Sequence, residues 1–300
     1  MKDKIDITIS VINWNTSDML GRCIESVLNS TKLASFELFV IDNDSSDDFH
    51  AVSQRFSSGS RVTFIQNRRN ELLLAKNISY ERARGRYFCA LGPDATVEPD
   101  CIARLYEFLE EHPGAGAVTA NLVNPDGSPQ MYYRRLLTPW NFIFSTHFGK
   151  KIDALFFRNF YRGHFTYEML DTDMSSEVEQ PPGDACFMVR RAALQGQETI
   201  VDPKIPFYFS DVDICKRIYG NGYHIYLVGA AHALHQKASS SGRASREWRN
   251  EAHRRGMEAY FRKHYPLIAI VIILIARFDQ WMYEITRPHQ KILAKRKGRE

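Results

Sequence analysis

Acidic and amide side chains follow two apolar, strand-like runs near the start of the sequence. The first group is Asn13-Trp14-Asn15 and the second is Asp42-Asn43. The ring and amides of the first group can hold a base and a ribose, and the oxygens of the second can accept a hydrogen bond from a pyrimidine N3–H. Asn and Asp are also common in turns, because they tolerate left-handed backbone and form Asx-turns. Each group is therefore either part of a nucleotide site or a turn.

Asp94 is the candidate ligand for a divalent cation. It belongs to Gly92-Pro93-Asp94, directly after an apolar run and five residues before Pro99. A carboxylate at this place can bind Mn²⁺ or Mg²⁺ through oxygen, and such a metal would neutralise a departing diphosphate. The alternative is an aspartate that caps a helix or forms a turn. His235, which follows the last strand-like run, is either a ligand or a structural histidine.

Asp211 lies in Phe209-Ser210-Asp211-Val212-Asp213, where a helix is predicted to begin. A carboxylate near a helix N-terminus is stabilised even without a catalytic role. Two common nucleotide motifs find no support in the sequence. No GxxxxGK[ST] loop is present, and Gly114-Ala115-Gly116 is not continued by a third glycine, because position 119 is threonine.

The hydrophobic periodicity predicts an α/β protein. Strand-like and helical segments alternate, with strands at 7–12, 36–41, 62–65, 87–91 and 115–123 and helices at 19–28, 49–56, 72–83 and 99–111. Such alternation predicts βαβ units and a mostly parallel central sheet with flanking helices. Ligands of these sheets bind beyond the carboxyl ends of the strands, which is where the polar groups lie.

The rest of the sequence is expected to complete this domain and to add a C-terminal helical extension. Residues 128–180 show little periodicity, which predicts an irregular insertion. A strand at 183–190, a helix at 211–218 and a strand at 223–228 follow. We therefore expect one domain over 1–240 and C-terminal helices over 241–300, beginning with a charged helix at 245–264.

Composition narrows the class of protein. The chain has 300 residues and a formal net charge of +4, which is too small to imply binding to nucleic acid. Its five cysteines are odd in number and form no CxxC pair, which argues against a disulfide framework and fits a reducing, cytoplasmic setting. The N-terminus leads straight into a strand-like run, without the apolar region of a signal peptide.

Several segments together resemble the family-2 glycosyltransferases, and among these a rhamnosyltransferase-like subgroup. The resemblance covers residues 7–264 apart from the irregular middle. It is carried by the order and spacing of these segments: Ile9-Ser10-Val11-Ile12-Asn13-Trp14-Asn15, Val40-Ile41-Asp42-Asn43 with Ser45-Ser46-Asp47, Gly92-Pro93-Asp94 with Glu98-Pro99, Gly183 to Arg191, Phe207 to Arg217, and Gly222-Tyr223 with the later His235.

The resemblance implies a GT-A (Rossmann-like) fold and an inverting, metal-dependent transfer of a sugar from a nucleotide diphosphate donor to a hydroxyl group. The family expectation for the donor is a UDP- or dTDP-sugar, and the subgroup suggests dTDP-rhamnose. The implied roles are metal ligand for Asp94 and His235, general base for Asp211, and donor binding for Asn13, Trp14, Asn15, Asp42, Asn43 and Asp94. A single displacement needs one base and one electrophile, and this set would supply both.

Three features depart from the family pattern. Gly92 stands where the family usually has Asp or Asn, and Ser210 stands where it has Glu. The segment 67–77 carries Arg68, Arg69 and Glu71 where relatives are rich in glycine, and these arginines either bind phosphate or lie in solvent. The departures favour one rival interpretation, a GT-A domain that binds a nucleotide sugar or glycan without turnover. A second rival is a structural subunit of a membrane assembly that makes glycans.

The irregular middle is expected to receive the acceptor, a lipid-linked or cell-surface glycan. Sugars stack on aromatic faces and lipid pyrophosphates attract arginine, whereas the alternative is a loop that packs a small core of its own. The residues concerned are Tyr132, Tyr133, Arg134, Arg135, Trp140, Phe142, Phe144, Phe156, Phe157, Phe160 and Tyr161.

The apolar run 267–276 predicts contact with a membrane surface. Ten residues make a helix of about 15 Å, half of a bilayer core, and Arg277 and Asp279 interrupt any longer span. Such a run fits an interfacial helix on the anionic inner face of the cell membrane, with a packing or dimer helix as the alternative. The flanking residues are Arg262, Lys263, His264, Trp281 and Tyr283, and the tail adds Lys291, Lys295, Arg296, Lys297 and Arg299.

Overall fold

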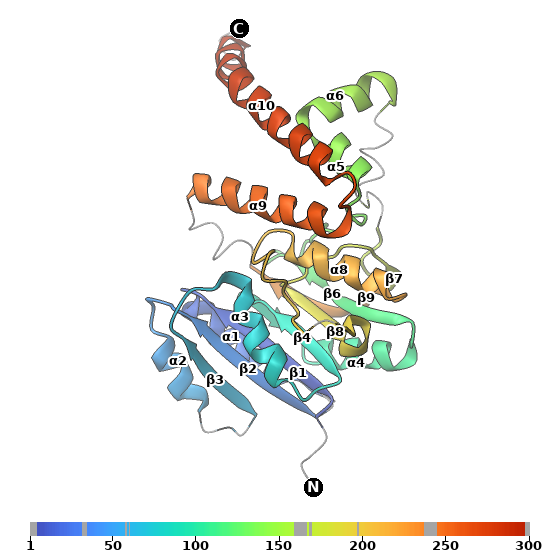
Figure 1. Ribbon diagram of the computed structural model, residues 1–300. Helices are drawn as coiled ribbons and strands as arrows, with labels where there is room; N and C mark the ends of the chain where they lie inside the picture. The colour runs from blue at the N-terminus through green and yellow to red at the C-terminus, as the bar shows by residue number, and fades with distance from the viewer. Residues whose placement is uncertain are drawn as a thin grey trace. The chain divides into compact units, whose positions relative to one another are not determined.

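The computed structural model describes residues 5–31, 35–57, 59, 61–158, 167, 170–196, 198–236 and 245–297, without the side chains of 284 and 286–297. The chain divides into two compact units, which we name the sheet unit and the helical unit (Figure 1). The sheet unit comprises Met1–Leu136 and Met169–Gly256, and the helical unit comprises Leu137–Glu168 and Met257–Glu300.

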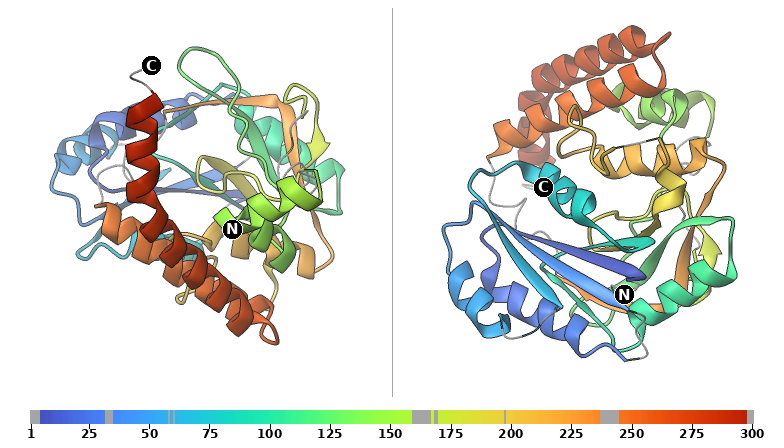
Figure 2. Two further views of the ribbon diagram at one scale, coloured as in Figure 1. Left: turned by 90° about the horizontal axis from the view of Figure 1, so that it is seen from above. Right: turned by 60° about the horizontal axis from the view of Figure 1, so that its bottom comes forward.

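The first half of the sheet unit is a parallel sheet. Its strands lie in the order β3 (Val62–Asn67), β2 (Phe36–Asn43), β1 (Ile7–Asn13) and β4 (Tyr87–Leu91), and each pairs in parallel with its neighbour. Helices α1 (Ser17–Leu28) and α2 (Phe49–Phe56) lie on one face, and α3 (Ala75–Arg82) lies on the other (Figure 2). Because both faces are covered, every residue of β2 and β4 is buried.

The second half of the sheet is mixed. Strand β8 (Cys186–Arg190) runs antiparallel between β4 and β6 (Ala115–Val123), and β6 pairs in parallel with β9 (His224–His235). The short strands β5 (Ala95–Val97) and β7 (Ser176–Glu177) add antiparallel to β9. The predicted α/β fold is thus confirmed, with the parallel pairings concentrated around β1. Strands as short as β5 and β7 have no readable period, so the sequence pattern did not reveal them.

Three longer helices complete the sheet unit: α4 (Cys101–Glu111), α8 (Ser210–Gly220) and the first part of α9 (Arg246–His264). The expected helix at 99–111 begins two residues later than Pro99, and single turns of 3₁₀-helix occupy Leu72–Leu74 and Arg191–Leu194. Helix α8 is anchored by a buried ion pair, in which Arg217 Nε lies 2.9 Å from Asp213 Oδ2.

This ion pair leads to a prediction about stability. Arg217→Met would leave the Asp213 carboxylate buried without its counter-charge, and we expect the free energy of unfolding to fall by about 3–5 kcal/mol. The double variant Asp213→Leu with Arg217→Met removes both charges and is expected to be less destabilised than the single variant. Urea unfolding of the three proteins measures this order, and a double variant less stable than Arg217→Met would contradict it.

The helical unit contains α5 (Pro139–Ser145), α6 (His147–Phe156) and α10 (Ala269–Lys297). The first two occupy a stretch where the sequence predicted no regular element. Thr138 and Thr146 begin them by accepting hydrogen bonds from the backbone N–H groups of Asn141 and Gly149, a capping signal that outweighs the weak periodicity of such short helices. None of the helices in the described part of the chain is long and apolar enough to cross a membrane.

Helix α10 begins within the apolar run 267–276 and continues through Arg277 and Asp279. Among the residues predicted to meet the acceptor or the membrane, some cannot be assessed. Phe160, Tyr161 and Arg299 lie outside the described residues, as do the side chains of Lys291, Lys295, Arg296 and Lys297.

Candidate functional site

A cavity of about 830 Å³ lies beyond the carboxyl ends of β1, β2 and β4, where a ligand site is expected in such a sheet. Five of the predicted site residues line it: Trp14, Asn43, Asp94, Asp211 and His235. They come from five separate parts of the sequence, so it is the fold that brings them together. The cavity is also lined by residues for which the sequence predicted no role: Lys76, Asp184, Phe207, Ser245 and Trp248.

Asp94 and His235 form a pair on one wall of the cavity. The Nε2 atom of His235 lies 3.6 Å from Asp94 Oδ1, and both side chains remain partly accessible. Strand β5 begins directly after Asp94, and its first residue, Ala95, is in register with His235 on β9. The backbone N–H of Gln236 also donates to the Asp94 carbonyl oxygen at 2.9 Å. The short strand β5 is therefore what positions the carboxylate against the imidazole.

The buried amide of Gln130 orients the imidazole of His235. Its Nε2 donates to the His235 carbonyl oxygen at 2.8 Å and to Asn124 Oδ1 at 2.9 Å, which leaves its Oε1 facing His235 Nδ1 at 2.9 Å. An amide oxygen only accepts, so Nδ1 must carry the hydrogen, and in the neutral imidazole Nε2 is the acceptor nitrogen that faces Asp94. An imidazole held in this tautomer by a neighbouring acceptor is typical of metal-ligating histidines.

This pair suits a divalent cation that also binds phosphate. No group of three or more His, Cys, Asp or Glu side chains that could hold a metal occurs among the described residues. Mg²⁺ in phosphate-handling sites is commonly held by one or two carboxylates together with the substrate's phosphates and water. One carboxylate and one oriented imidazole, both facing a large cavity, fit that pattern. Asp94 and His235 are therefore able to hold such an ion together with a diphosphate.

Gly92 takes part in the shape of this wall. A Cβ atom built on Gly92 would lie 2.7 Å from Asp94 Oδ1 and 3.1 Å from the Asp184 carbonyl oxygen. A side chain at position 92 would thus require the Asp94 carboxylate to move. The glycine that departs from the family pattern is compatible with the observed placement of Asp94, and it contributes no ligand of its own.

Asp211 faces the same cavity from the first turn of α8. Phe209, two residues before Asp211, has a φ of 71°, a left-handed conformation that is costly for a bulky side chain. The opposing segment comes very near, because a Cβ on Gly183 would lie 2.8 Å from Asp211 Cβ. Burial, and then the negative charge of Asp184, raise the pKa of Asp211 to about 6, although the N–H of Val212 and the charge of Lys76 oppose the rise. Such a carboxylate is ionised at neutral pH and is more basic than usual.

Lys76 and Asp184 form an ion pair inside the cavity that sequence analysis missed. The Lys76 ammonium contacts Asp184 Oδ1, and only 7% of the lysine side chain is exposed, compared with 44% of the aspartate side chain. Lysine on a surface helix normally points into solvent, so nothing in the local pattern indicated a buried position. The pair places a positive charge where a phosphate or a sugar hydroxyl can reach it.

The predicted donor-binding residues divide into two groups. Trp14 and Asn43 line the cavity, whereas Asn13, Asn15 and Asp42 are not part of its lining. Asn13 Nδ2 donates to Asp42 Oδ1 at 3.0 Å, since the two residues are in register on β1 and β2. Asn15 Oδ1 accepts from the backbone N–H of Ser46 at 2.7 Å. These three side chains hold the loops on either side of Trp14 and Asn43, so their observed contacts are structural.

Asn43 also fixes the loop that carries the unusual charged residues. Its Nδ2 donates to the Leu72 carbonyl oxygen at 3.0 Å, and its Oδ1 accepts from the backbone N–H of Glu71 at 3.1 Å. Arg69 pairs with Glu71 within this loop. The loop is thereby tied to the end of β2, next to the cavity.

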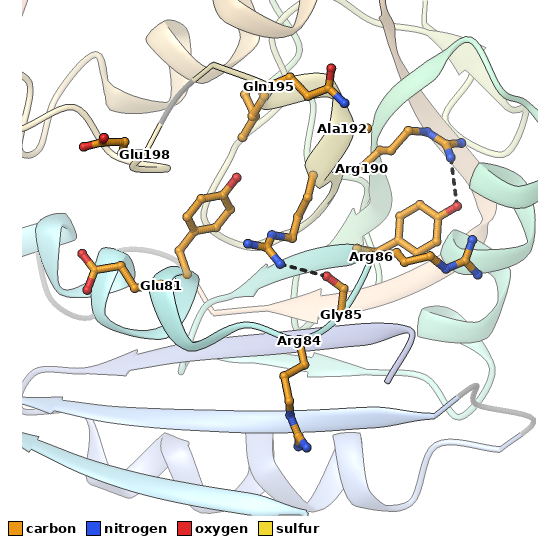
Figure 3. Close-up of a pocket in the computed structure, with 12 residues that line it drawn as sticks. Glu81, Arg84, Gly85, Arg86, Arg190, Ala192, Gln195 and Glu198 are labelled. Atoms are coloured by element: carbon orange, nitrogen blue, oxygen red, sulfur yellow. Dashed lines mark hydrogen bonds between the residues drawn. The ribbon is translucent and has the colours of Figure 1, made fainter. Parts of the chain in front are cut away.

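A second cavity of about 820 Å³ lies at the opposite, N-terminal end of β4 (Figure 3). Four arginines surround it, but each is held by protein groups. Arg84 pairs with Glu37 and Arg86 pairs with Asp6. The other two donate to backbone carbonyl oxygens, Arg190 to Ala115 and Arg191 to Ala83. Figure 3 shows Arg84 pointing away from the side chain of Arg190. This cavity is therefore a structural feature of the sheet edge, and the first cavity is the candidate site.

The chain is similar to several known proteins. A family model described as Glycosyl transferase family 2 matches residues 8–196. An uncharacterized protein of Sinorhizobium fredii is 24% identical over 248 residues, which make up 79% of this chain and 25% of that protein. An N-acetylglucosaminyl-diphospho-decaprenol L-rhamnosyltransferase of Mycobacterium tuberculosis is 26% identical over 250 residues, covering 74% of this chain and 75% of that protein.

The chain spans only a small part of several relatives, for example 13% of a chondroitin synthase of Pasteurella multocida that is 29% identical over 125 residues. Among solved structures, S. aureus TarS in complex with UDP-GlcNAc has a TM-score of 0.56 at 14% identity, over 86% of this chain and 67% of that one. GalNAc-T7 with UDP, GalNAc and Mn²⁺ also has a TM-score of 0.56, at 16% identity, over 87% of this chain and 48% of that one. These likenesses confirm the GT-A fold, and together with the match of the family model they show that the chain belongs to glycosyl transferase family 2.

Proposed function

We propose that this protein transfers a sugar, with inversion, from a nucleoside diphosphate donor to a hydroxyl group of a glycan acceptor. The observation that carries the proposal is that a basic carboxylate, Asp211, and a metal-competent pair, Asp94 with His235, line one cavity. A direct displacement at an anomeric carbon requires these two functions, a base for the attacking hydroxyl and stabilisation of the leaving diphosphate.

In this reaction Asp211 accepts the proton of the acceptor hydroxyl as the oxygen forms its bond to the anomeric carbon. The bond from that carbon to the diphosphate oxygen breaks, and the electron pair leaves with the nucleoside diphosphate. Mn²⁺ or Mg²⁺, when bound, supplies positive charge at this leaving group. Asp94 and His235 would hold the ion, and Lys76 adds a positive charge to the lining of the same cavity. Attack from the side opposite the leaving group inverts the anomeric configuration.

Trp14 and Asn43 are the proposed contacts for the donor's base and ribose, since both line the cavity at the ends of β1 and β2. A UDP- or dTDP-sugar fits an aromatic ring beside amide and carboxylate acceptors. The TarS structure contains UDP-GlcNAc, and a relative is named a rhamnosyltransferase, which supports this donor class and suggests rhamnose as one candidate sugar.

The proposed acceptor is a lipid-linked or cell-surface glycan, met at the cytoplasmic face of the membrane. The relative from Mycobacterium tuberculosis is named for a decaprenol-linked substrate, which supports this class. Among the aromatic residues expected to meet the acceptor, Tyr132 is exposed. Tyr133 is only 2% exposed, so it belongs to the core of the sheet unit instead.

A donor-cleavage assay tests the proposal against its two rivals. Purified protein is incubated with Mn²⁺ and a panel of UDP- and dTDP-sugars, and release of the nucleoside diphosphate is followed with and without a polyprenyl-linked glycan. Release that increases with acceptor supports a transferase. Nucleotide binding without release in any condition would indicate a binding module, and an absence of both would indicate a structural subunit.

The raised pKa of Asp211 predicts the pH dependence of transfer. Only the ionised carboxylate accepts a proton, so kcat/KM should rise with pH through a midpoint near 6. Asp184→Asn removes the negative charge that helps to raise this pKa, and the midpoint should move to lower pH. Asp44→Asn, at an exposed position, is the matched control and should leave the midpoint unchanged. A midpoint that stays fixed or rises in Asp184→Asn would exclude this electrostatic coupling.

A further inference from the structure

The helical unit carries most of the large apolar side chains that are exposed among the described residues. The helical unit makes up only 76 of the 300 residues. The larger sheet unit contributes just four of these exposed side chains, Met131, Tyr132, Met174 and Trp248. The exposed apolar residues of the helical unit are Trp140, Phe148, Leu155, Phe156, Phe157, Leu267, Ile268, Ile270, Val271, Leu274, Phe278, Trp281, Met282 and Ile285. An apolar surface of this kind marks a site of interaction.

On α10 these residues form a continuous stripe, which we name the α10 stripe: Ile270, Val271, Leu274, Phe278, Trp281, Met282 and Ile285. Their spacing of three and four residues places them on one side of a helix, over about 22 Å of its length. The other side is used within the protein, since Ile272 and Ile273 are at most 5% exposed. Helix α10 thus has one packed face and one exposed apolar face.

The two charged residues that interrupt a longer apolar span, Arg277 and Asp279, both have partners within the helical unit. Arg277 pairs with Glu258 at 2.9 Å. Asp279 is 8% exposed and accepts hydrogen bonds from the backbone N–H groups of His147 and Phe148, at 3.0 and 2.8 Å. It therefore completes the first turn of α6, where a carboxylate is favoured. The acidic charge of Asp279 is therefore buried inside the helical unit, and Arg277, whose side chain is 56% exposed, adds a cation beside the α10 stripe.

Charge distinguishes between the possible partners. The ranges of the helical unit contain 13 Lys and Arg and 6 Asp and Glu, a formal net charge of +7, whereas the whole chain has only +4. Exposed cations among these are Lys150, Lys151, Arg158, Arg262 and Lys263. Two copies of such a unit would repel each other, and an anionic lipid surface would attract it. The combination of an apolar stripe and surrounding cations is the composition of an interfacial membrane helix.

We propose that the helical unit docks on an anionic lipid bilayer, with α10 lying in the plane of the membrane and the α10 stripe inserted at the boundary of headgroups and acyl chains. This docking deepens the proposed placement of the transferase at the membrane, and only the lipid-linked acceptor is taken from the proposed function. It does not depend on the chemistry of the donor cavity. Asp279 acts as a positioning residue, because its bonds to α6 keep its own charge away from the lipid.

Flotation with lipid vesicles tests the docking. The full chain is mixed with neutral phosphatidylcholine vesicles or with vesicles that contain about 30% phosphatidylglycerol, at low salt and at about 0.5 M salt. We expect binding to the anionic vesicles, weakened by salt. The variant Leu274→Glu with Phe278→Glu should reduce partitioning by about tenfold or more. Met174→Glu, which places the same charge on a side chain 64% exposed in the sheet unit, should bind like wild type.

Titration of UDP in parallel separates this inference from the proposed function. A double variant that loses vesicle binding and keeps its melting temperature and nucleotide affinity supports the docking surface. Wild-type protein that floats with anionic vesicles but binds no nucleotide would refute the transferase proposal and leave the docking intact. The docking is overturned if wild-type protein ignores anionic vesicles, if the double variant binds them equally, or if light scattering shows a dimer that the double variant abolishes.

Discussion

Asp211→Asn is expected to lower the rate of sugar transfer by about 10²–10⁴-fold, because the amide has no basic lone pair to accept the proton of the attacking hydroxyl. The shape of the side chain is retained, and Asp211 is proposed to act on the acceptor. The affinity for the nucleoside diphosphate should therefore stay close to that of wild type. Steady-state kinetics together with nucleotide titration measure the two effects separately.

Folding provides the control for this variant. The pKa of Asp211 is raised to about 6, above the value of an aspartate in an unfolded chain, so ionisation of this group opposes folding. The protonated carboxyl of Asp211 stabilises the folded state fully at a pH below the pKa of an aspartate in the unfolded chain. This stabilisation is lost as the pH rises through 6. The amide of Asp211→Asn does not ionise, so the variant does not lose stability in this way. Its melting temperature at neutral pH should equal or exceed that of wild type. A variant that is inactive because it is unfolded would contradict this account of the residue.

The second large effect concerns the imidazole that faces Asp94. His235→Ala should weaken Mn²⁺ binding in the presence of UDP by more than about 100-fold, since it removes a proposed ligand. Gln130→Met keeps a side chain of similar length but loses the acceptor that fixes the His235 tautomer, and a loss of about 10–100-fold is expected. Electron paramagnetic resonance of free Mn²⁺ measures both losses directly, without any turnover.

A matched substitution separates orientation from packing. Gln130→Glu keeps an acceptor for His235 Nδ1, but it loses the amide donor to Asn124 and to the His235 carbonyl oxygen. If the hydrogen-bond acceptor for His235 Nδ1 is what supports metal binding, Gln130→Glu should bind Mn²⁺ more tightly than Gln130→Met. Equal affinities in wild type and in both Gln130 variants would show that this amide has no part in a metal site.

Asp94, Asp211 and His235 line one cavity, as the family resemblance implied, and Asp94 follows β4, whose parallel neighbours end at the same edge of the sheet. Asn13 and Asp42 also reach that edge, but their register places them side by side, and they satisfy each other rather than facing the cavity. Register of this kind depends on pairing between distant strands, which local periodicity does not encode.

Other parts of the site have no local signal at all. Lys76 is buried only because α3 packs against the sheet with Asp184 nearby. Gln130 orients His235 only because β9 ends beside it. Strand β5, with three residues, and the cap that Asp279 provides for α6 likewise depend on contacts between segments far apart in the sequence. The sequence pattern thus predicted which segments reach this cavity, and tertiary contacts determine which side chains enter it.

Calorimetric titration of UDP and dTDP, with and without Mn²⁺, tests the central claim most directly when wild type and Asp94→Ala are compared. The account predicts binding of at least one nucleotide by wild type that requires Mn²⁺, and loss of that binding in Asp94→Ala with an unchanged melting temperature. A wild-type protein that binds neither nucleotide in any condition, or an Asp94→Ala variant that keeps the Mn²⁺-dependent affinity, would contradict the assignment of this cavity as a metal-assisted donor site.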